Sequence, residues 1–190
     1  MSSPQTVIIN SILERPGPTI VGIDGRSASG KSTFANLLVA TADNAELICT
    51  DDFYRPMLAK HRAQLTPEQG AELYFDIERL AEVLVPLRAG HAAHFQIYDW
   101  STDRLSEWRT VSPAPLIVIE GVHAADTRCR PFLDLIVFVD AAADLRWKRM
   151  LGRGQNNPEQ MRRWLAAEDC YFDRQRVRNA AQWIVSGGER

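Results

Sequence analysis

The sequence has little that would point to nucleic acid, a membrane or an exported protein. Its 22 Lys and Arg residues against 24 Asp and Glu residues give a formal net charge of −2, so no broad surface for neutralising nucleic-acid phosphates is expected. No apolar run is long enough to cross a bilayer, and the first residues lack the basic start and apolar stretch of a signal peptide. We therefore expect a cytoplasmic protein that acts on neither nucleic acid nor membranes.

Disulfide and metal-ligand patterns are also missing. The 3 cysteines, Cys49, Cys129 and Cys170, are widely spaced, and the 4 histidines show no ligand spacing. This usage is typical of reduced thiols in a protein without a zinc site. No repeat or low-complexity tract interrupts the 190 residues, and 45% of them are hydrophobic. Residues 1–190 are therefore expected to form a single domain with a sizeable core.

What the sequence does contain is a phosphate-binding loop. Residues 25–32 read GRSASGKS, which is G-x-x-x-x-G-K-S, with an apolar run at 19–24 before it and helical periodicity after it. In this setting the backbone N–H groups cradle phosphates, Lys31 reaches the outer phosphates and the Ser32 hydroxyl can bind Mg²⁺. The alternative is a glycine turn that merely joins a strand to a helix. We expect a nucleotide to bind along Gly25, Ser27, Ala28, Ser29, Gly30, Lys31, Ser32 and Thr33.

Strand and helix patterns alternate along the rest of the chain. Apolar runs at 46–50, 116–121, 135–140 and 183–185 predict strands in addition to the one before the loop. The continuous β-branched runs are typical of a parallel sheet with helices on both faces. The order predicts an α/β fold, a three-layer P-loop NTPase domain around a parallel five-stranded sheet.

Helices and a hairpin complete the expected organisation. A β-hairpin within about 92–113 would pair residues 94–98 with 108–111 through a long polar connection. Thr66 and Asp76 have the form of helix caps. Helices are expected at 6–14, after the P-loop, after Thr66, after Asp76, at 142–151 and at 158–178.

Acidic residues follow two of the predicted strands. Asp51 and Asp52 come after the run at 46–50, and Glu120 ends the run that begins at Leu116. Ligands bind at the carboxyl ends of strands in open α/β sheets. These carboxylates are therefore candidates for holding Mg²⁺ or for taking a proton from an attacking hydroxyl. Strand-ending acids also serve as helix caps or turn formers, which is the alternative.

Arginine is concentrated late in the chain. Arg146, Arg149 and Arg153 recur three and four positions apart, so one helix face presents all three. Guanidinium groups stabilise the charge on a transferring phosphoryl group, and a lid that carries them excludes water. We expect an arginine-bearing lid over about 146–158, with Gly152 and Gly154 allowing it to hinge.

The alternative for this cluster is a solvated helix face whose arginines pair with Asp144, Glu159 and Glu168. From Arg162 onward we favour that alternative over a role in the lid.

The order of these motifs resembles that of the uridine kinase family. This family belongs to a group of P-loop kinases that includes phosphoribulokinase, pantothenate kinase and nicotinamide riboside kinase. The resemblance covers about residues 18–187. The P-loop alone indicates only nucleotide binding. The combination of Asp-x-Phe-Tyr with Tyr-Asp-aromatic at these spacings is a much more specific signal of the family. The segments that carry the resemblance are 22–25, 50–54, 74–76, 98–100, 119–122 and the arginine lid.

The resemblance implies a role for each matching residue. Asp51 would be the general base, and the ligands of Mg²⁺ would come from Ser32, Asp51 and Glu120. Arg146, Arg149 and Arg153 would close over the phosphates. Aromatic faces would pack on a base and Asp76 would accept ribose hydroxyls. An alternative for Tyr98 and Trp100 is packing beneath the hairpin. The acceptor site would be lined by Tyr54, Phe75, Asp76, Tyr98 and Trp100.

Two departures from the family concern the acceptor. Uridine kinases carry a base-reading histidine three residues after the aromatic of Tyr-Asp-aromatic, where this chain has Asp103 with Arg104 beside it. The connection at 155–158 is also shorter than the family's usual lid. We assign Asp103 and Arg104 to the acceptor site, and the missing histidine leaves the acceptor open.

We interpret the chain as an ATP- and Mg²⁺-dependent phosphotransferase for a hydroxyl of a small metabolite, with uridine or cytidine as the favoured acceptors. Nicotinamide riboside and pantothenate are alternatives within the same class. A nucleotide-dependent switch protein is the alternative from another class. The guanine-reading Asn-Lys-x-Asp segment of GTPases is absent, and a switch would need neither an acceptor site nor an arginine lid.

Overall fold

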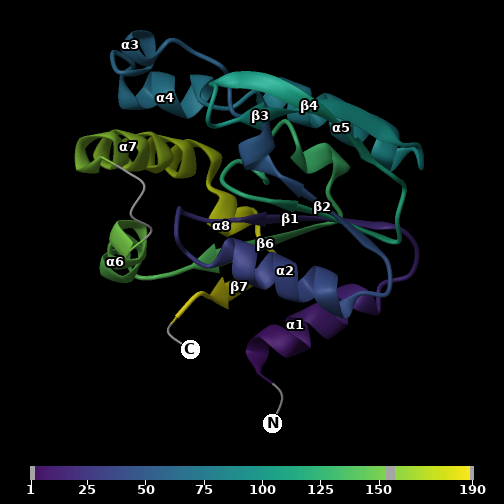
Figure 1. Cartoon of the computed structure of the whole chain (residues 1–190). Helices are drawn as coiled ribbons and strands as arrows, with labels where there is room; N and C mark the ends of the chain where they lie inside the picture. Colours follow the sequence, from purple (N-terminus) through teal and green to yellow (C-terminus); the bar gives the residue numbers. More distant parts are fainter. Residues whose placement is uncertain (1–2, 153–156, 189–190) are drawn as a thin grey trace.

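A parallel sheet of five strands forms the centre of the protein (Figure 1). The computed structural model describes residues 3–152 and 157–188. The strands lie in the order β2-β5-β1-β6-β7, and every neighbouring pair is parallel. This confirms the predicted three-layer α/β architecture. The bounds are β1 Thr19–Asp24, β2 Ala45–Cys49, β5 Leu116–Glu120, β6 Leu135–Asp140 and β7 Trp183–Ser186.

The register of the sheet aligns the carboxyl ends of its central strands. Glu120, the last residue of β5, pairs with Cys49 on one side and with Ile23 on the other. The segments that follow β1, β2 and β5 therefore leave the sheet at a common edge, which is where ligands bind in such folds.

Strand β5 shows why the sheet is covered on both faces. All five of its residues are buried. Ile117 and Ile119 belong to one apolar core, whereas Leu116 and Val118 belong to the other. Alternating residues of a strand point to opposite faces, so an uninterrupted apolar strand requires a helical layer on each side.

Helices supply these layers. In Figure 1, α1 and α2 lie below the sheet and α5 lies above it. At one side of the molecule α4 packs against α7, and α8 contacts β6. The bounds are α1 Pro4–Leu13, α2 Lys31–Thr41, α3 Ala59–Arg62, α4 Pro67–Leu73, α5 Ile77–Arg88, α6 Ala143–Gly152, α7 Pro158–Gln175 and α8 Val177–Ala180.

Local capping explains where several helices begin and end. Thr66 forms the predicted capping box of α4, and Asp76 caps α5 as predicted. The first helix begins at Pro4 rather than at residue 6, because the Ser3 side chain caps it. The last long helix ends at Gln175 rather than 178, because Arg176 has left-handed backbone (φ 46°).

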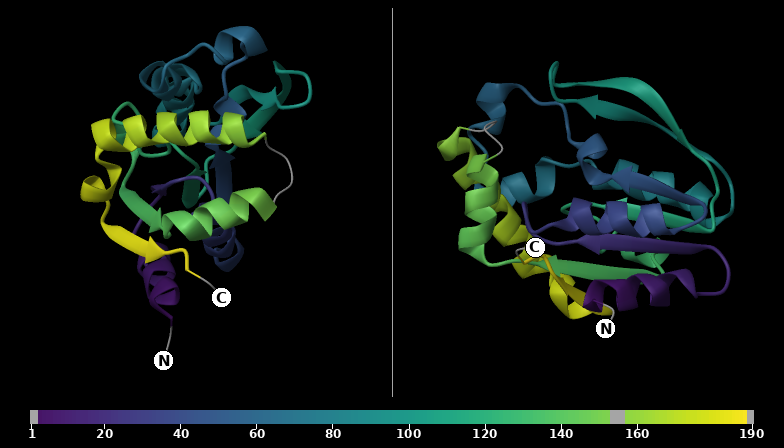
Figure 2. Two further views of the ribbon diagram at one scale, coloured as in Figure 1. Left: turned by 90° about the vertical axis from the view of Figure 1, so that its left-hand side faces the viewer. Right: turned by 60° about the horizontal axis from the view of Figure 1, so that its bottom comes forward.

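The hairpin of β3 (Ala93–Asp99) and β4 (Arg104–Val111) forms a separate two-stranded sheet above α5 (Figure 2). Residues 94–96 pair with 108–110 as predicted. The predicted long polar connection is wrong, because the strands continue to a tight turn at 100–103. The Asp99 carboxylate forms that turn by accepting hydrogen bonds from the Ser101 backbone N–H and the Thr102 hydroxyl.

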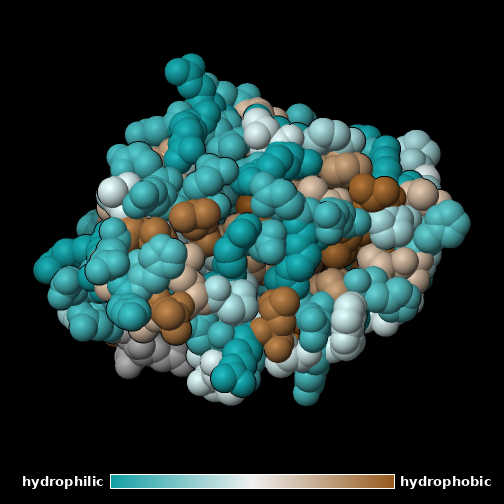
Figure 3. All heavy atoms as spheres, turned by 90° about the horizontal axis from the view of Figure 1, so that it is seen from above, coloured by the Kyte–Doolittle hydropathy of each residue, from teal (hydrophilic) through white to brown (hydrophobic). Residues whose placement is uncertain are grey.

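The face that carries this hairpin is mostly hydrophilic, with hydrophobic residues in separate patches (Figure 3). Over residues 3–152 and 157–188, no helix has the length and apolarity needed to span a membrane.

Candidate active site

The P-loop joins β1 to α2 and requires glycine at two points. A Cβ on Gly25 would lie 2.2 Å from the carbonyl oxygen of Val139, and Gly30 has left-handed backbone (φ 103°) directly before α2. Lys31 is buried, and its Nζ donates to the carbonyl oxygen of Arg26 at 3.0 Å. The predicted loop and its helix therefore form as the motif requires.

Asp24, a buried residue to which the sequence interpretation gave no role, holds the start of the P-loop in place. One Asp24 oxygen accepts the N–H of Gly25 at 2.7 Å, and the other accepts the N–H of Ala125 at 3.0 Å and the Tyr171 hydroxyl at 2.8 Å. Burial raises the pKa of Asp24, and these hydrogen bonds oppose the rise. Asp24 thus ties the start of the P-loop to the segment after β5 and to α7.

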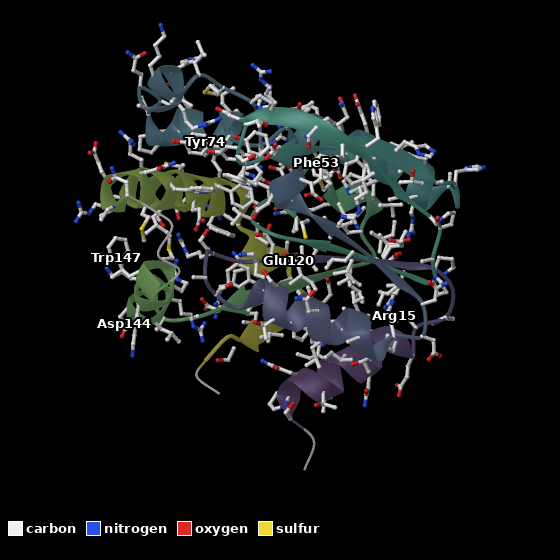
Figure 4. The ribbon with its side chains drawn as sticks, viewed as in Figure 1. Arg15, Phe53, Tyr74, Glu120, Asp144 and Trp147 are labelled. Atoms are coloured by element: carbon white, nitrogen blue, oxygen red, sulfur yellow. The ribbon has the colours of Figure 1, made fainter. Side chains whose placement is uncertain are left out.

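Ser32 and Glu120 place two oxygen ligands beside the loop. Ser32 Oγ donates to Glu120 Oε1 at 3.1 Å (Glu120 is labelled in Figure 4). Burial raises the pKa of Glu120, the charge of Lys31 lowers it, and the nearby charge of Asp51 raises it again. A hydroxyl and a buried carboxylate fit Mg²⁺, which binds through one or two carboxylates, phosphate oxygens and water. The described ranges contain no group of three or more His, Cys, Asp and Glu that could hold a metal by itself.

The segments after β2 and β5 approach each other at Gly121. A Cβ on Gly121 would lie 1.8 Å from Thr50 Oγ1, and its backbone is left-handed (φ 139°). This contact places the turn Thr50–Phe53, which carries Asp51, next to Glu120.

Asp51 and Asp52 differ in their surroundings. Asp51 is exposed, and its charge acts on Glu120. Asp52 is half-buried and forms an ion pair with Arg109 of β4 at 3.3 Å. Burial raises the pKa of Asp52, and Arg109 opposes the rise. Asp52 therefore joins the hairpin to the sheet, while Asp51 lies at the edge that carries Glu120.

Aromatic rings from several segments gather beyond Asp51 in what we call the aromatic wall: Tyr54, Tyr74, Tyr98, Trp100 and Trp164. Tyr54 stacks on Trp100 with ring centroids 4.6 Å apart, and Trp100 stacks on Trp164 at 5.8 Å. Tyr98 is buried, whereas Trp100 is 50% exposed. The structure therefore brings the predicted Tyr54, Tyr98 and Trp100 together.

Tyr74 and Trp164 are members of the wall to which the sequence interpretation gave no role. Together with Tyr54 they line a cavity of about 170 Å³ that also borders Arg62, Arg163 and Gln160. Trp164 lies on the helix after the predicted lid, and no sequence motif distinguishes it from a residue packed in the core.

Phe75 and Asp76 lie directly beneath the wall. Phe75 is 2% exposed and meets Tyr54 edge to face at 5.2 Å. Asp76 accepts from the Arg79 N–H at 3.4 Å as the cap of α5 and pairs with Arg55 at 3.3 Å. Both residues are near the predicted site, but Asp76 already has structural partners.

Asp103 has more hydrogen-bond partners than the sequence interpretation foresaw. It accepts two bonds from the Arg62 guanidinium (2.9 and 3.2 Å), one from the Tyr98 hydroxyl at 2.6 Å and one from the Met57 N–H at 3.3 Å. Burial would raise the pKa of Asp103, but the bonds from Arg62 and Tyr98 prevail and lower it. Asp103 thus fastens the hairpin turn to α3. The neighbouring Arg104 is exposed at the start of β4.

The described arginines of the predicted lid lie beside the P-loop. Arg149 Nη1 donates to the Ala28 carbonyl at 3.2 Å, and Arg146 Nε donates to the Ala141 carbonyl at 3.2 Å. Burial and the charge of Arg26 lower the pKa of Arg146. Arg153 lies outside the described residues, so its role stays a prediction.

A cavity of about 230 Å³ adjoins the same part of the loop. It is lined by Ala28, Gly30, Thr33, Arg149 and residues 187–188, among others. The segment after β7 approaches so closely that a Cβ on Gly187 would lie 1.6 Å from the Ser29 carbonyl oxygen. The sequence interpretation assigns residues 187–188 to no site. The only local hint that the backbone approaches the loop here is the pair of glycines after the last strand.

Arg163 and Glu168 bear on whether the arginines from Arg162 onward belong to a lid or to a solvated helix face. Arg163 pairs with Glu159 at 3.3 Å on the surface of α7, in agreement with the solvated-face interpretation. The assignment of Glu168 to that face is wrong, because Glu168 is 2% exposed. It accepts hydrogen bonds from the backbone N–H and the hydroxyl of Ser27 in the P-loop.

Comparison with known proteins agrees with this geometry. A profile of the phosphoribulokinase / uridine kinase family matches residues 20–158. A uridine kinase of Staphylococcus haemolyticus is 34% identical over 145 residues, which cover 71% of this chain and 68% of that protein. The mouse (Mus musculus) uridine-cytidine kinase-like 1 is 31% identical over 145 residues, which are 70% of this chain.

The chain spans only 26% of the length of that mouse relative. Among solved structures, one described as a possible uridine kinase from Bacillus stearothermophilus superposes with a TM-score of 0.77 at 26% identity. That alignment covers 96% of this chain and 97% of the other.

Proposed function

The chain belongs to the phosphoribulokinase / uridine kinase family, and from this premise we propose that it transfers the terminal phosphoryl group of ATP to a hydroxyl of a small metabolite. The favoured acceptor is a nucleoside such as uridine or cytidine, because the relatives described above are named uridine kinase and uridine-cytidine kinase-like 1. The observation that carries the proposal is that Asp51 lies beside the Ser32–Glu120 pair, at the sheet edge where the P-loop and the aromatic wall meet.

Residues of the P-loop would hold the donor. The backbone N–H groups around Gly30 and the Lys31 ammonium would bind the phosphates, and the cavity beside Thr33 and Arg149 has room for the nucleoside part. The buried Ser29 hydroxyl has no hydrogen-bond partner among the described residues. Buried polar groups normally have partners, so this hydroxyl is consistent with a loop that binds a polar ligand.

Ser32 and Glu120 would hold Mg²⁺, which neutralises phosphate charge when bound. Their pairing at 3.1 Å brings the two ligands to one point. Asp51 could add a ligand directly or through water.

Asp51 would act on the acceptor hydroxyl as a general base. It is exposed on the turn beside Glu120, and its charge acts on that residue, whereas the Asp52 carboxylate lies against Arg109 of the hairpin. The position of Asp51 next to Glu120 favours it as the base. A base is effective when it is within hydrogen-bond reach of the proton that it accepts. Arg146 and Arg149 would approach the transferring group from α6 and stabilise its negative charge.

The acceptor would lie against the aromatic wall, whose rings suit the flat face of a base. Asp103 occupies the position of the family's base-reading histidine, and Arg62 and Tyr98 already bind it. This observation favours a second candidate within the same class, a kinase for nicotinamide riboside, pantothenate or another hydroxylated metabolite.

The test is a coupled ADP-release assay with ATP and Mg²⁺ against uridine, cytidine, other nucleosides, nicotinamide riboside and pantothenate. Turnover on uridine or cytidine would support the first candidate. Turnover only on another acceptor would support the second. ATP binding with no turnover on any acceptor would favour either a metabolite outside this panel or a nucleotide-dependent switch.

A further inference from the structure

One face of α7 runs from the aromatic wall to the P-loop. Trp164, Glu168 and Tyr171 lie four and three positions apart, so they share this face. Trp164 stacks on Trp100 at 5.8 Å, Glu168 binds Ser27 and the Tyr171 hydroxyl donates to Asp24 at 2.8 Å. The last two contacts lie on the P-loop and at its start.

Glu168 is the unusual member of this face because it is a buried acid. Its Oε2 accepts the Ser27 backbone N–H at 2.9 Å, and its Oε1 accepts the Ser27 hydroxyl. Burial raises its pKa, while Lys31, Ser27 and Arg146 oppose the rise. A buried carboxylate is unfavourable unless it is paired and hydrogen-bonded, and here the partners belong to the P-loop and the helix that carries the lid arginines.

We propose that Glu168 is a positioning residue for the donor nucleotide. By accepting from both hydrogen-bond donors of Ser27, the backbone N–H and the hydroxyl, it fixes that residue, so that the following N–H groups of the loop stay directed at the phosphates. Its effect on the nucleotide is exerted through Ser27, and it does not itself contact the acceptor. This inference rests on the proposed function only in taking the P-loop as the nucleotide site.

The consequence is a specific defect. Replacing Glu168 with glutamine keeps the shape, an acceptor oxygen for the Ser27 N–H and an amide N–H that the Ser27 hydroxyl can accept. It removes the carboxylate charge that strengthens both bonds, so the loop is held less firmly. The Kd for MgADP should rise about tenfold, whereas kcat at saturating ATP and the acceptor KM should change by less than about twofold. A residue with only a structural role would lower the melting temperature without this split.

The experiment is calorimetric titration of MgADP into wild type, Glu168→Gln, Ser27→Ala and the double variant, with no acceptor present. Because Glu168 acts through Ser27, the double variant should bind no more weakly than about the weaker single variant. The matched control is Asp173→Asn, the same charge change at an exposed position of α7, which should bind MgADP within about twofold of wild type. Thermal melts of each apo variant report folding.

Wild-type affinity for MgADP in Glu168→Gln would overturn the inference, and so would fully additive effects of the two single substitutions. If Glu168→Gln does not fold, Ser27→Ala carries the same test, with an expected rise of about threefold in Kd. Failure of the proposed acceptors is seen separately, as wild-type protein that binds MgADP but releases no ADP with any acceptor. Failure of wild type to bind MgADP would overturn both.

Discussion

The two ends of the proposed active site, a phosphate end and an acceptor end, are built in different ways. The phosphate end comes from one continuous segment, residues 24–32. Its shape depends on Gly25, where a Cβ would overlap the Val139 carbonyl oxygen, and on the left-handed backbone of Gly30. The acceptor end comes from side chains of the turn after β2, the hairpin and α7, which meet only in the folded protein. The phosphate end therefore constrains the order of residues, whereas the acceptor end can change by single side-chain replacements.

The carboxylates at the two ends are also held in different ways. At the phosphate end, Glu120 and Glu168 are buried, and Lys31 lowers the pKa of each against the effect of burial. At the acceptor end, Asp103 and Asp76 are already paired with Arg62 and Arg55. The carboxylates of the phosphate end are thus buried near a lysine and bonded to serines, whereas those of the acceptor end are held in ion pairs with arginines.

The largest effect is expected from Lys31→Ala, which removes the buried ammonium of the P-loop. We expect kcat/KM to fall by about a thousandfold or more, because phosphate charge in a water-excluded site loses its main counter-charge. ADP release measures this, with the melting temperature as the control for folding. Activity within about tenfold of wild type would contradict the assignment of the phosphate end.

Asp51→Asn tests whether Asp51, which lies between the phosphate end and the acceptor end, is the general base. Loss of a general base lowers kcat by about a hundredfold to ten-thousandfold, and we expect KM for ATP to change by less than about threefold. Asp52→Asn is the matched change, and it should lower kcat less because Asp52 pairs with Arg109. A greater loss of kcat in Asp52→Asn would show that the two roles are reversed.

Trp164→Ala tests whether the acceptor end is a wall of stacked rings. Removing one ring from a stack costs about 1–3 kcal/mol of base binding, so the acceptor KM should rise about tenfold. The KM for ATP should stay within about twofold. Trp108→Ala offers a control on the hairpin, since that side chain is 71% exposed. Equal effects of the two substitutions would argue against the wall.

Asp103→Asn should have the smallest effect and should depend on pH. Because the pKa of Asp103 is lowered in the folded protein, its ionised form stabilises the fold above the unfolded pKa, and this contribution is lost as pH falls through the folded value. The side chain is 34% exposed, so solvent screens its pairing and the loss is about 1 kcal/mol or less at neutral pH.

Urea unfolding at several pH values measures this difference. Wild type and Asp103→Asn should differ at neutral pH and converge in acid. A difference that is independent of pH would show that the carboxylate charge has no part in fastening the turn.

The sequence predicts the phosphate end and the sheet well, because both depend on local patterns. The P-loop motif, the apolar strand runs and the caps at Thr66 and Asp76 each act within a few residues, and the structure confirms the elements that they predict. For the hairpin, the sequence predicts a longer connection than the structure has, because the hydrogen bonds of Asp99 that close the turn leave no periodic signal.

The acceptor end was only partly predictable. Tyr54, Tyr98 and Trp100 belong to motifs, whereas Trp164 and Glu168 come from a helix whose polar residues are typical of a solvated surface. The contacts of Trp164 and the burial of Glu168 depend on where α7 lies relative to the aromatic wall and the P-loop. A pair such as Arg62 and Asp103, which lie 41 positions apart, is equally invisible to a local pattern.

The path of α7 has a thermodynamic consequence. The same helix contacts the wall through Trp164 and the loop through Ser27 and Asp24, so ordering at one end reduces the freedom left to lose at the other. Coupling of the two substrates through this helix would be equal in both directions, as linkage requires, and the cross-effects expected of Trp164→Ala and Glu168→Gln limit it to about twofold. Within that limit, α7 would favour the complex with both substrates over the complex with either one.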